Sequence, residues 1–200
     1  MRLSFSRCCL ALGAFALFTA CKPAPYTPKP RGYYQIQLPE HSYQTFDAPG
    51  YPYAFEYPTY ARVVKDTSFF GQRPESPYWI NIEFPSLNGA IYLSYKVIGE
   101  KYSLQHLLED AHEMSYFHDK RADYINDTLF RNNNNVIGVM YTVGGNAASA
   151  YQFFATDSVR HYLRGALYFD VSPNADSLKP VNDFLKQDMD HLLGTLRWKN

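Results

Sequence analysis

The chain has 200 residues, with 19 Lys and Arg against 19 Asp and Glu and a formal net charge of 0. This balance excludes a strongly basic protein that binds nucleic acid through phosphate contacts. The only cysteines are Cys8, Cys9 and Cys21, and their number and placement exclude a scaffold held together by disulfides.

The first 20 residues have the pattern of a secretory signal peptide. Arg2 and Arg7 precede an apolar stretch, Cys8–Phe18, which is followed by small residues. The stretch is shorter than the roughly 20 residues that span a bilayer, so we expect segment 1–20 to be removed. Loss of the two arginines leaves 17 Lys and Arg against 19 Asp and Glu, a net charge of about −2, and no nucleic-acid partner is expected.

Cys21 stands where cleavage should occur. The sequence Phe18-Thr19-Ala20-Cys21 resembles a bacterial lipobox, although Phe18 replaces the usual Leu, so Cys21 is the predicted lipidation site. The mature chain has no other cysteine, which excludes a cysteine metal site or thiol nucleophile. Segment 21–31 carries four prolines and predicts an extended tether of roughly 30 Å between membrane and domain.

Residues 32–200 are long enough for one domain, and most of its predicted elements are strands. Strands bordered by proline, as edge strands often are, are predicted at Tyr33–Leu38, Tyr53–Tyr57 and Ala61–Lys65. Alternating apolar residues predict half-buried strands at Tyr78–Phe84 and Ala90–Ile98, joined by a turn at 87–89. Further strands are predicted over 123–131, 136–143, 150–157 and 159–169.

Two amphipathic helices complete the domain. The first is predicted from Leu104 to about Lys120 with Ser103 as its N-cap, and the second from about Ser177, its cap, to Gly194. Their apolar stripes must be buried against the strands. The predicted fold class is therefore α+β, an antiparallel meander packed against helices in an α/β/α sandwich.

Motifs for catalysis and for cofactors are absent from the sequence. It contains no GxSxG, no phosphate-binding loop ending in GK[ST] and no GxGxxG, so no catalytic residue and no cofactor is predicted. His106, His112 and His118 are spaced six apart, about 240° around a helix axis. That spacing does not bring two imidazoles to one face, so no metal site is expected and the charged face is interpreted as solvated.

Two surfaces are predicted for binding. Aromatic residues make up 17% of the chain, and their alternation with polar residues predicts an aromatic sheet face formed by Trp79, Tyr92, Tyr162, Arg164 and Tyr168. In the alternative interpretation, the proline-rich N-terminal segment covers this face. A polar patch is predicted at one end of the meander, formed by Gly145, Asn146, Ser149, Gln152 and Arg164. Its alternative is structural, with Gly145 and Asn146 in a turn and Arg164 a surface or ion-paired residue.

Three ordered blocks carry a resemblance to a known family. They are EYPTYARV (56–63), GGNAASAYQFFATDSVRHYLRGALYF (144–169) and PNADSLKPVNDFLKQDMDHLLGTLRWK (173–199). Together they resemble the GldD family of gliding-motility lipoproteins of Bacteroidota over nearly the whole mature chain. The resemblance implies an envelope lipoprotein acylated at Cys21, with a role in gliding and type IX secretion and without established catalytic residues. The order of elements also resembles the Mog1/PsbP-like fold, whose members are mostly accessory proteins.

The resemblance implies two further features. Lys22 is followed by Pro23 and Ala24 rather than by acidic residues, which favours a lipoprotein that faces the periplasm from the inner membrane or the inner leaflet of the outer membrane. Bacteroidota add O-glycans at Asp-Ser/Thr followed by an aliphatic residue, so Thr128, Ser158 and Ser177 are candidate glycosylation sites.

Two functional hypotheses follow from the sequence. In the first, the protein is a lipid-anchored, non-enzymatic periplasmic accessory or scaffold protein that binds other envelope proteins of gliding and secretion. In the second, it is an envelope lipoprotein that binds or hydrolyses glycan on its aromatic sheet face.

Overall fold

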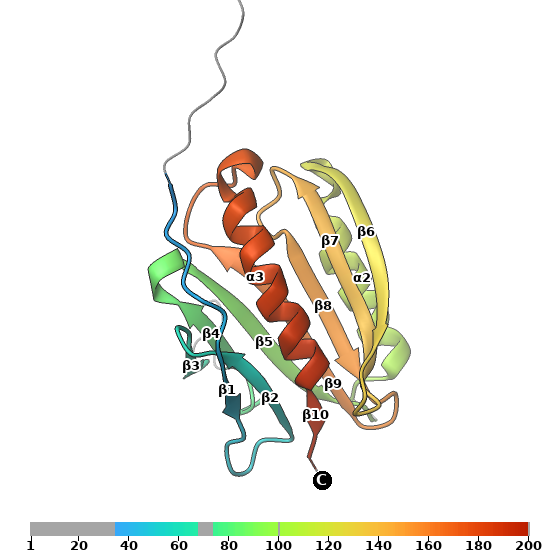
Figure 1. Cartoon of the computed structure of the whole chain (residues 1–200). Helices are drawn as coiled ribbons and strands as arrows, with labels where there is room; N and C mark the ends of the chain where they lie inside the picture. The colour runs from blue at the N-terminus through green and yellow to red at the C-terminus, as the bar shows by residue number, and fades with distance from the viewer. Residues whose placement is uncertain (1–34, 68–73, 100, 200) are drawn as a thin grey trace, which may run out of the picture. The chain divides into compact units, whose positions relative to one another are not determined.

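The computed structural model describes residues 35–67, 74–99 and 101–199, which belong to one compact unit, Gln35–Asn200. The predicted signal peptide 1–20 and the tether 21–31, with Cys21, lie outside the described residues. The central feature of the described chain is a seven-stranded sheet, with strand order β3-β4-β5-β9-β8-β7-β6 (Figure 1). Every neighbouring pair in this sheet is antiparallel.

The predicted meander is present as two runs of strands. The first run is β3 (Arg62–Lys65), β4 (Ile80–Phe84) and β5 (Gly89–Val97). The second is β6 (Ala122–Arg131), β7 (Ile137–Gly145), β8 (Tyr151–Thr156) and β9 (His161–Phe169). The chain crosses from β5 to the far edge of the sheet and then returns, so that β9 pairs with β5 in the middle.

The period-two pattern of the central strands predicted their faces correctly. On β4, Ile80, Ile82 and Phe84 are buried, whereas the intervening residues are only partly buried. The predicted turn into β5 includes a short 3₁₀ helix, η1 (Pro85–Leu87), and Asn88 in the left-handed region with φ of 51°. Asparagine tolerates that conformation better than most residues, which explains its place in this hairpin.

Both predicted helices are present. Helix α2 (Leu104–Tyr116) has the expected N-cap, since the Ser103 hydroxyl accepts a hydrogen bond from the His106 N–H, and a 3₁₀ turn, η2 (Phe117–Lys120), follows it. Helix α3 (Ala175–Thr195) begins earlier than predicted. Its N-cap is Asn174, which accepts from the Ser177 N–H, so the prediction of Ser177 as the cap is wrong. Both residue types favour this position, and the tertiary placement of the loop decides between them.

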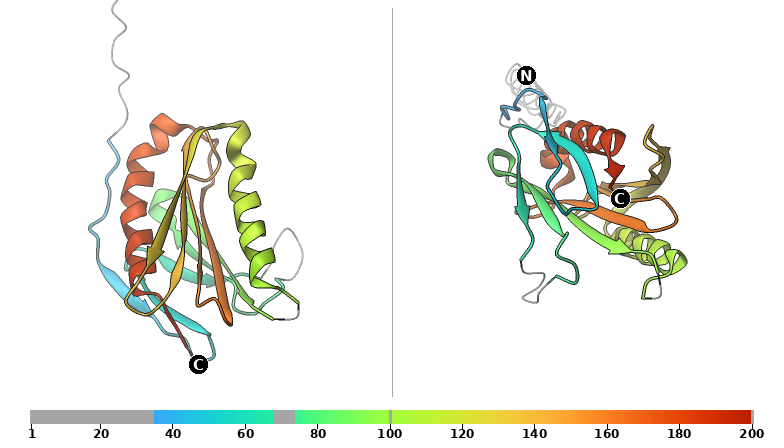
Figure 2. Two further views of the ribbon diagram at one scale, coloured as in Figure 1. Left: turned by 90° about the vertical axis from the view of Figure 1, so that its right-hand side faces the viewer. Right: turned by 90° about the horizontal axis from the view of Figure 1, so that it is seen from below.

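The two helices lie on opposite faces of the sheet (Figure 2, left). The apolar stripe of α3, which includes Leu185, Met189 and Leu192, packs in the main core against β4, β5, β8 and β9. On the other face, Leu107 and Ala111 of α2 form a smaller core with Tyr141, Phe154 and Tyr162. This arrangement confirms the predicted α+β class with the sheet between helices. In the described part of the chain, no helix is long and apolar enough to cross a bilayer.

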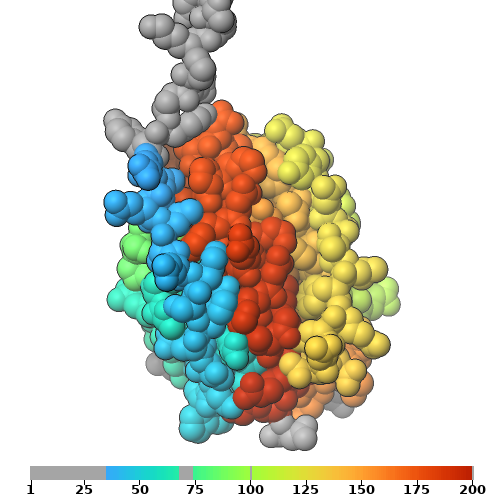
Figure 3. Space-filling view, in the orientation of Figure 1, coloured from blue at the N-terminus to red at the C-terminus, as the bar shows by residue number. Residues whose placement is uncertain are grey.

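A second, three-stranded sheet lies beside α3 and was not predicted. It has the order β1-β2-β10, with β1 (Tyr43–Phe46), β2 (Tyr53–Pro58) and β10 (Arg197–Trp198). The space-filling view shows α3 running between the β1–β2 segment and β6 (Figure 3). Asp188 on α3 is buried and forms hydrogen bonds with His41, Tyr43 and Tyr60. These bonds join the segment around β1 and β2 to α3.

The predicted first strand, Tyr33–Leu38, is wrong over its described part. Residues 35–38 are exposed and form no strand, and β1 begins only at Tyr43. A strand is stable only when a neighbour completes its backbone hydrogen bonds, and β2 pairs with Tyr43–Phe46 rather than with residues 35–38.

Candidate functional site

Three residues of the predicted polar patch fasten a loop. Gly145 ends β7 with φ of 91°, a conformation that favours glycine. Asn146 Oδ1 accepts a hydrogen bond of 2.8 Å from the Ala175 N–H at the start of α3. Ser149 is buried, and its hydroxyl donates to the Tyr151 carbonyl at 3.2 Å. The Asn146 bond holds the β7–β8 loop against α3, whereas the Ser149 bond lies within the β7–β8 segment itself.

The other two patch residues meet on neighbouring strands. Arg164 on β9 donates through Nη2 to Oε1 of Gln152, which is buried on β8. The Gln152 Nε2 atom has no hydrogen-bond partner among the described residues. Hydrogen bonds therefore join Gln152 to Arg164, whereas Asn146 is bonded to a different element, α3.

The predicted aromatic face is partly buried. Trp79 is 7% exposed and donates through Nε1 to the Tyr95 carbonyl at 2.9 Å, and Tyr162 is 2% exposed and donates to the Leu107 carbonyl of α2 at 3.0 Å. Neither ring is free to stack on a ligand. Tyr92, in contrast, is 46% exposed and packs edge-on against Tyr168, with ring centroids 5.9 Å apart.

Helix α2 covers only part of this face. It packs on Tyr141, Phe154 and Tyr162, which lie on β7, β8 and β9. Beside it, a groove of about 810 Å³ lies over β4, β5 and β9. The groove is lined by Asp66, Asn81, Tyr92, Asp110, Glu113, Met114, Phe117, His118, Arg164, Ala166 and Tyr168. We call it the α2 groove.

The α2 groove combines apolar walls with opposite charges. Burial lowers the pKa of His118 below its usual range, and the positive charge of Arg164 lowers it further, so His118 is neutral at pH 7. Arg164 is then the one cation in a lining that also contains the carboxylates of Asp66, Asp110 and Glu113. Such a groove suits a partly apolar ligand that also forms hydrogen bonds. Across the described residues, no three or more His, Cys, Asp or Glu side chains are grouped as metal ligands.

The sequence indicated some groove residues but missed others. Tyr92, Arg164 and Tyr168 belonged to the predicted aromatic face, whereas the contribution of α2 was interpreted only as a solvated charged face. Met114 and Phe117 are 45% and 76% exposed. The buried stripe of α2 consists of Leu107, Ala111 and Ser115. Apolar residues that lie outside this stripe are the signal in the sequence for this surface.

The three candidate glycosylation residues are exposed. Thr128 lies on β6 at the edge of the sheet, and Ser158 lies in the β8–β9 turn with φ of 65°. Ser177 is in the first turn of α3. Cys21, the predicted lipidation site, is outside the described residues.

Comparison with known proteins gives a family match over most of the chain. The family model for the gliding motility lipoprotein GldD matches residues 23–198. No curated protein matches the sequence. Among solved structures, the chain is similar to the solution structure of cyanobacterial PsbP (CyanoP) from Synechocystis sp. PCC 6803. The identity is 13%, the alignment covers 86% of this chain and 100% of that chain, and the TM-score is 0.47.

The matched residues include both faces of the sheet and the lining of the α2 groove. They also include part of the proline-rich segment that precedes the described residues. The chain belongs to the family of the gliding motility lipoprotein GldD, which associates it with the cell envelope and with gliding motility.

Proposed function

We propose that this protein is a lipid-anchored, non-enzymatic accessory protein that faces the periplasm and supports the gliding machinery and its type IX secretion apparatus by binding other envelope proteins. The observation that carries the proposal is the family match over residues 23–198. The α2 groove supports it, because exposed Met114, Phe117 and Tyr92 beside polar groups resemble the mixed surface of a protein interface.

Deletion and complementation test this role. Deletion of the gene should abolish spreading and reduce type IX secretion, and the wild-type gene should restore both. Phe117→Asp should fail to restore them, because it places a charge on an exposed apolar residue of the groove. Val171→Asp is the matched control, since Val171 is 49% exposed and does not line the groove. Normal spreading and secretion after deletion would reject the proposal.

The anchor is part of the proposal and has its own test. Acylation of Cys21 would attach the domain to the membrane through the tether 21–31. Mass spectrometry of the purified protein should find lipid on an N-terminal Cys21. A Cys21→Ser variant should move from the membrane to the soluble periplasmic fraction. An unmodified Cys21 in a protein that still sediments with membranes would contradict the anchor.

A second candidate function is glycan binding in the same groove. Exposed Tyr92 and partly buried Tyr168 both line the groove, and Asn81, Asp110 and Arg164 offer hydrogen-bonding groups beside them. The lipoprotein in detergent should then bind peptidoglycan or chitin fragments, and Tyr168→Ala should remove binding without loss of secondary structure. Tyr124→Ala is the control, because Tyr124 is 53% exposed on β6, away from the groove lining. Equal binding by both variants would exclude this function.

We also propose O-glycosylation of at least one of Thr128, Ser158 and Ser177. Their exposure is compatible with modification, and each follows an aspartate and precedes an aliphatic residue. Intact-mass measurement of the protein from its native host should show a glycan that a Thr128→Ala, Ser158→Ala, Ser177→Ala triple variant lacks. An unmodified wild-type protein would contradict the proposal.

A further inference from the structure

Strand β6 forms one edge of the seven-stranded sheet, and β7 is its only strand partner in the described chain. Edge strands are usually protected by lysine, proline, a bulge or a covering segment. β6 contains no lysine or proline, and its register irregularity is confined to Ala122–Tyr124. Neither helix crosses its outer edge (Figure 2, left). Ile125–Arg131 is therefore a regular edge that can pair with a further strand.

Asp127, Leu129 and Arg131 form a row on the α2 face of this edge. Side chains two residues apart on a strand share a face, and so do opposed residues of an antiparallel pair. The β7 residues opposite Asp127 and Leu129 are Tyr141 and Val139, which pack in the small core with α2. Leu129 is 84% exposed, the largest exposed fraction among the large hydrophobic residues of the described chain. The row therefore places an exposed apolar side chain between an acid and a base.

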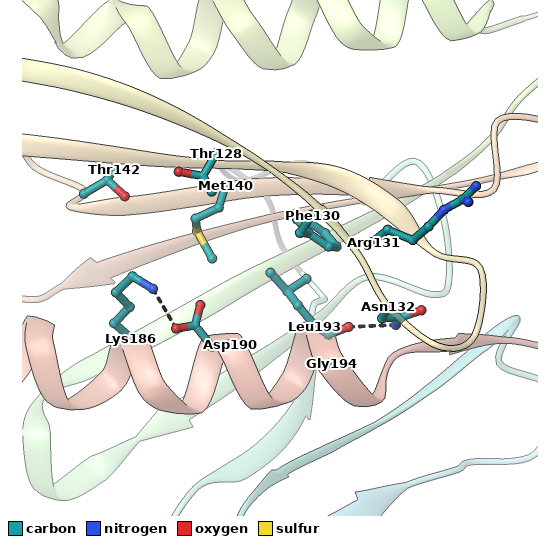
Figure 4. Close-up of a pocket in the computed structure, with 10 residues that line it drawn as sticks. All are labelled: Thr128, Phe130, Arg131, Asn132, Met140, Thr142, Lys186, Asp190, Leu193 and Gly194. Carbon is teal, nitrogen blue, oxygen red and sulfur yellow. Dashed lines mark hydrogen bonds and ion pairs between the residues drawn. The ribbon is translucent and has the colours of Figure 1, made fainter.

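Arg131 lies on this face even though it also borders a hollow beside α3. Across the sheet its row consists of the opposed residues Arg131, Ile137, Thr156 and Tyr162. Tyr162 donates to the Leu107 carbonyl of α2 at 3.0 Å, which identifies the face of the row. The hollow has a volume of about 210 Å³ and lies between the β6–β7 hairpin and α3. Figure 4 shows the Arg131 side chain directed away from α3.

A second copy of this edge complements the row. When two β6 strands pair antiparallel with Leu129 at the centre, Leu129 lies opposite Leu129 of the second copy. Asp127 of each copy then lies opposite Arg131 of the other copy, so each charge meets an opposite charge. The exposed Leu129 side chain is covered in the same arrangement. Such pairing uses one surface twice, as an isologous two-fold interface does.

Other registers of the same pairing fit less well. A two-fold axis perpendicular to the sheet keeps the α2 faces of both copies on one side, so the central residue always lies opposite itself. With Thr128 at the centre, Asp127 lies opposite Leu129. With the residue after Leu129 at the centre, Arg131 lies opposite Leu129. In both registers a charge faces an apolar side chain. With Asp127 at the centre, Arg131 meets Asp123 in the irregular part of β6, and the two Asp127 carboxylates repel each other.

We propose that two copies of this protein pair through their β6 edges, in the register centred on Leu129, and form a two-fold symmetric dimer with one continuous sheet. Only residues 127–131 of the two strands are opposed, so the interface is small and separate domains associate weakly. Attachment of both copies to one membrane would raise their effective concentration and favour the dimer. On the α3 face Thr128 meets Phe130 of the second copy, so a glycan on Thr128 would block pairing.

Charge variants of the full-length lipoprotein in detergent test the pairing by sedimentation equilibrium. Asp127→Arg and Arg131→Asp each put like charges opposite one another, so each variant alone should dimerise about tenfold more weakly than the wild type. An equal mixture of the two variants should restore dimers, because every opposed pair then has opposite charges. Arg62→Asp, an exposed change at the other edge of the sheet, is the control and should dimerise like the wild type.

Cysteine cross-linking in native membranes tests the register. Cys21 is the only cysteine after the predicted signal peptide, so an introduced thiol is easily followed. Leu129→Cys should form a disulfide between two copies under mild oxidation, because opposed Cβ atoms lie about 5 Å apart. Asp127→Cys and Thr128→Cys report the registers centred on those residues and should cross-link less. Val159→Cys, exposed in the β8–β9 turn, measures random collisions.

Each result decides for or against the dimer. Wild-type protein that stays monomeric up to the highest concentration would overturn it, and so would a Leu129→Cys variant that cross-links no more than Val159→Cys. Stronger cross-linking from position 127 or 128 would overturn the register. A dimeric wild type whose charge variants remain monomeric when mixed would reject the pairing of Asp127 with Arg131. Both experiments measure self-association, so their failure leaves the proposed function standing, and normal spreading after deletion leaves the dimer standing.

Discussion

Asp188 is the residue that fastens the N-terminal part of the domain to α3. It is 1% exposed, and its carboxylate accepts hydrogen bonds from His41 Nδ1 at 2.7 Å, from the Tyr43 hydroxyl at 3.0 Å and from the Tyr60 hydroxyl. An ionised carboxylate is only an acceptor, so all three partners donate. The signal in the sequence is an aspartate among the apolar residues of the α3 stripe, such as Leu185 and Leu192.

Replacement of Asp188 by alanine should destabilise the domain by about 3 kcal/mol, because partly buried donors lose their acceptor. Urea unfolding followed by circular dichroism measures this free energy. Asp183→Ala is the control, since Asp183 is 55% exposed and its ion pair within the described chain is with Lys179 on the same helix. The control should lose less than about 0.5 kcal/mol. Equal losses in both variants would show that the Asp188 contacts contribute nothing.

Tyrosines with raised pKa values predict a loss of stability in alkali. Burial raises the pKa of Tyr43, Tyr95, Tyr141 and Tyr151 from 10.0 to about 12. Because the folded state holds these hydroxyls neutral, their contribution to the free energy of unfolding is complete below pH 10. It is lost as the pH rises from 10 through 12. The free energy of unfolding in urea should therefore fall across this range. A value that stays constant from pH 10 to 12 would contradict the expected shifts.

At the scale of elements, the sequence predicts a strand or helix where one face of that element is buried. The alternation in β4 and β5 and the α3 stripe, for example, reflect burial against one large core. Strands β1 and β10 have 4 and 2 residues, and their pairing with β2 depends on tertiary position rather than on a local pattern. The sequence predicted only the sheet residues of the α2 groove. Which part of the sheet a helix leaves uncovered depends on how the helix and the sheet pack.

The turn between β6 and β7 caps the far end of α3. Asn132 Nδ2 donates to the carbonyls of Leu193 and Leu196 at 2.8 and 2.7 Å, and Asn132 Oδ1 accepts from the N–H groups of Asn134 and Val136. Carbonyls at the end of a helix lack partners within the helix, so an outside donor stabilises them. Through Asn132, this run of four asparagines, 132–135, also joins the sheet to α3.

Asn132→Ala should destabilise the domain by about 2 kcal/mol, because two helix carbonyls and two turn N–H groups lose a partner. Thermal unfolding by differential scanning calorimetry provides the comparison. Asn133→Ala, in the same turn, is the control, because Asn133 is exposed and its substitution should change stability by less than about 0.5 kcal/mol. A smaller effect at Asn132 than at Asn133 would refute the capping role.

At the scale of the whole molecule, the two ends of the described domain meet in one sheet. β2 pairs with β1 near the start of the domain and with β10 at its end. Asp47 after β1 binds both Arg197 and Lys199 at 2.6 Å. Trp198 also stacks on His161 of the central sheet, with ring centroids 5.1 Å apart. The last residues therefore connect the small sheet with the large one.

Removal of the residues after Leu196 should destabilise the domain by about 3 kcal/mol, since β10 pairing and the partly buried Trp198 ring are both lost. The truncated chain should unfold at lower urea concentration, and hydrogen exchange should accelerate first in β1 and β2. Lys199→Ala removes the exposed ion pair with Asp47 but keeps β10. This variant should lose less than about 1 kcal/mol of unfolding free energy. If truncation leaves the unfolding midpoint and exchange of Tyr53–Pro58 unchanged, β10 does not hold the ends of the domain together.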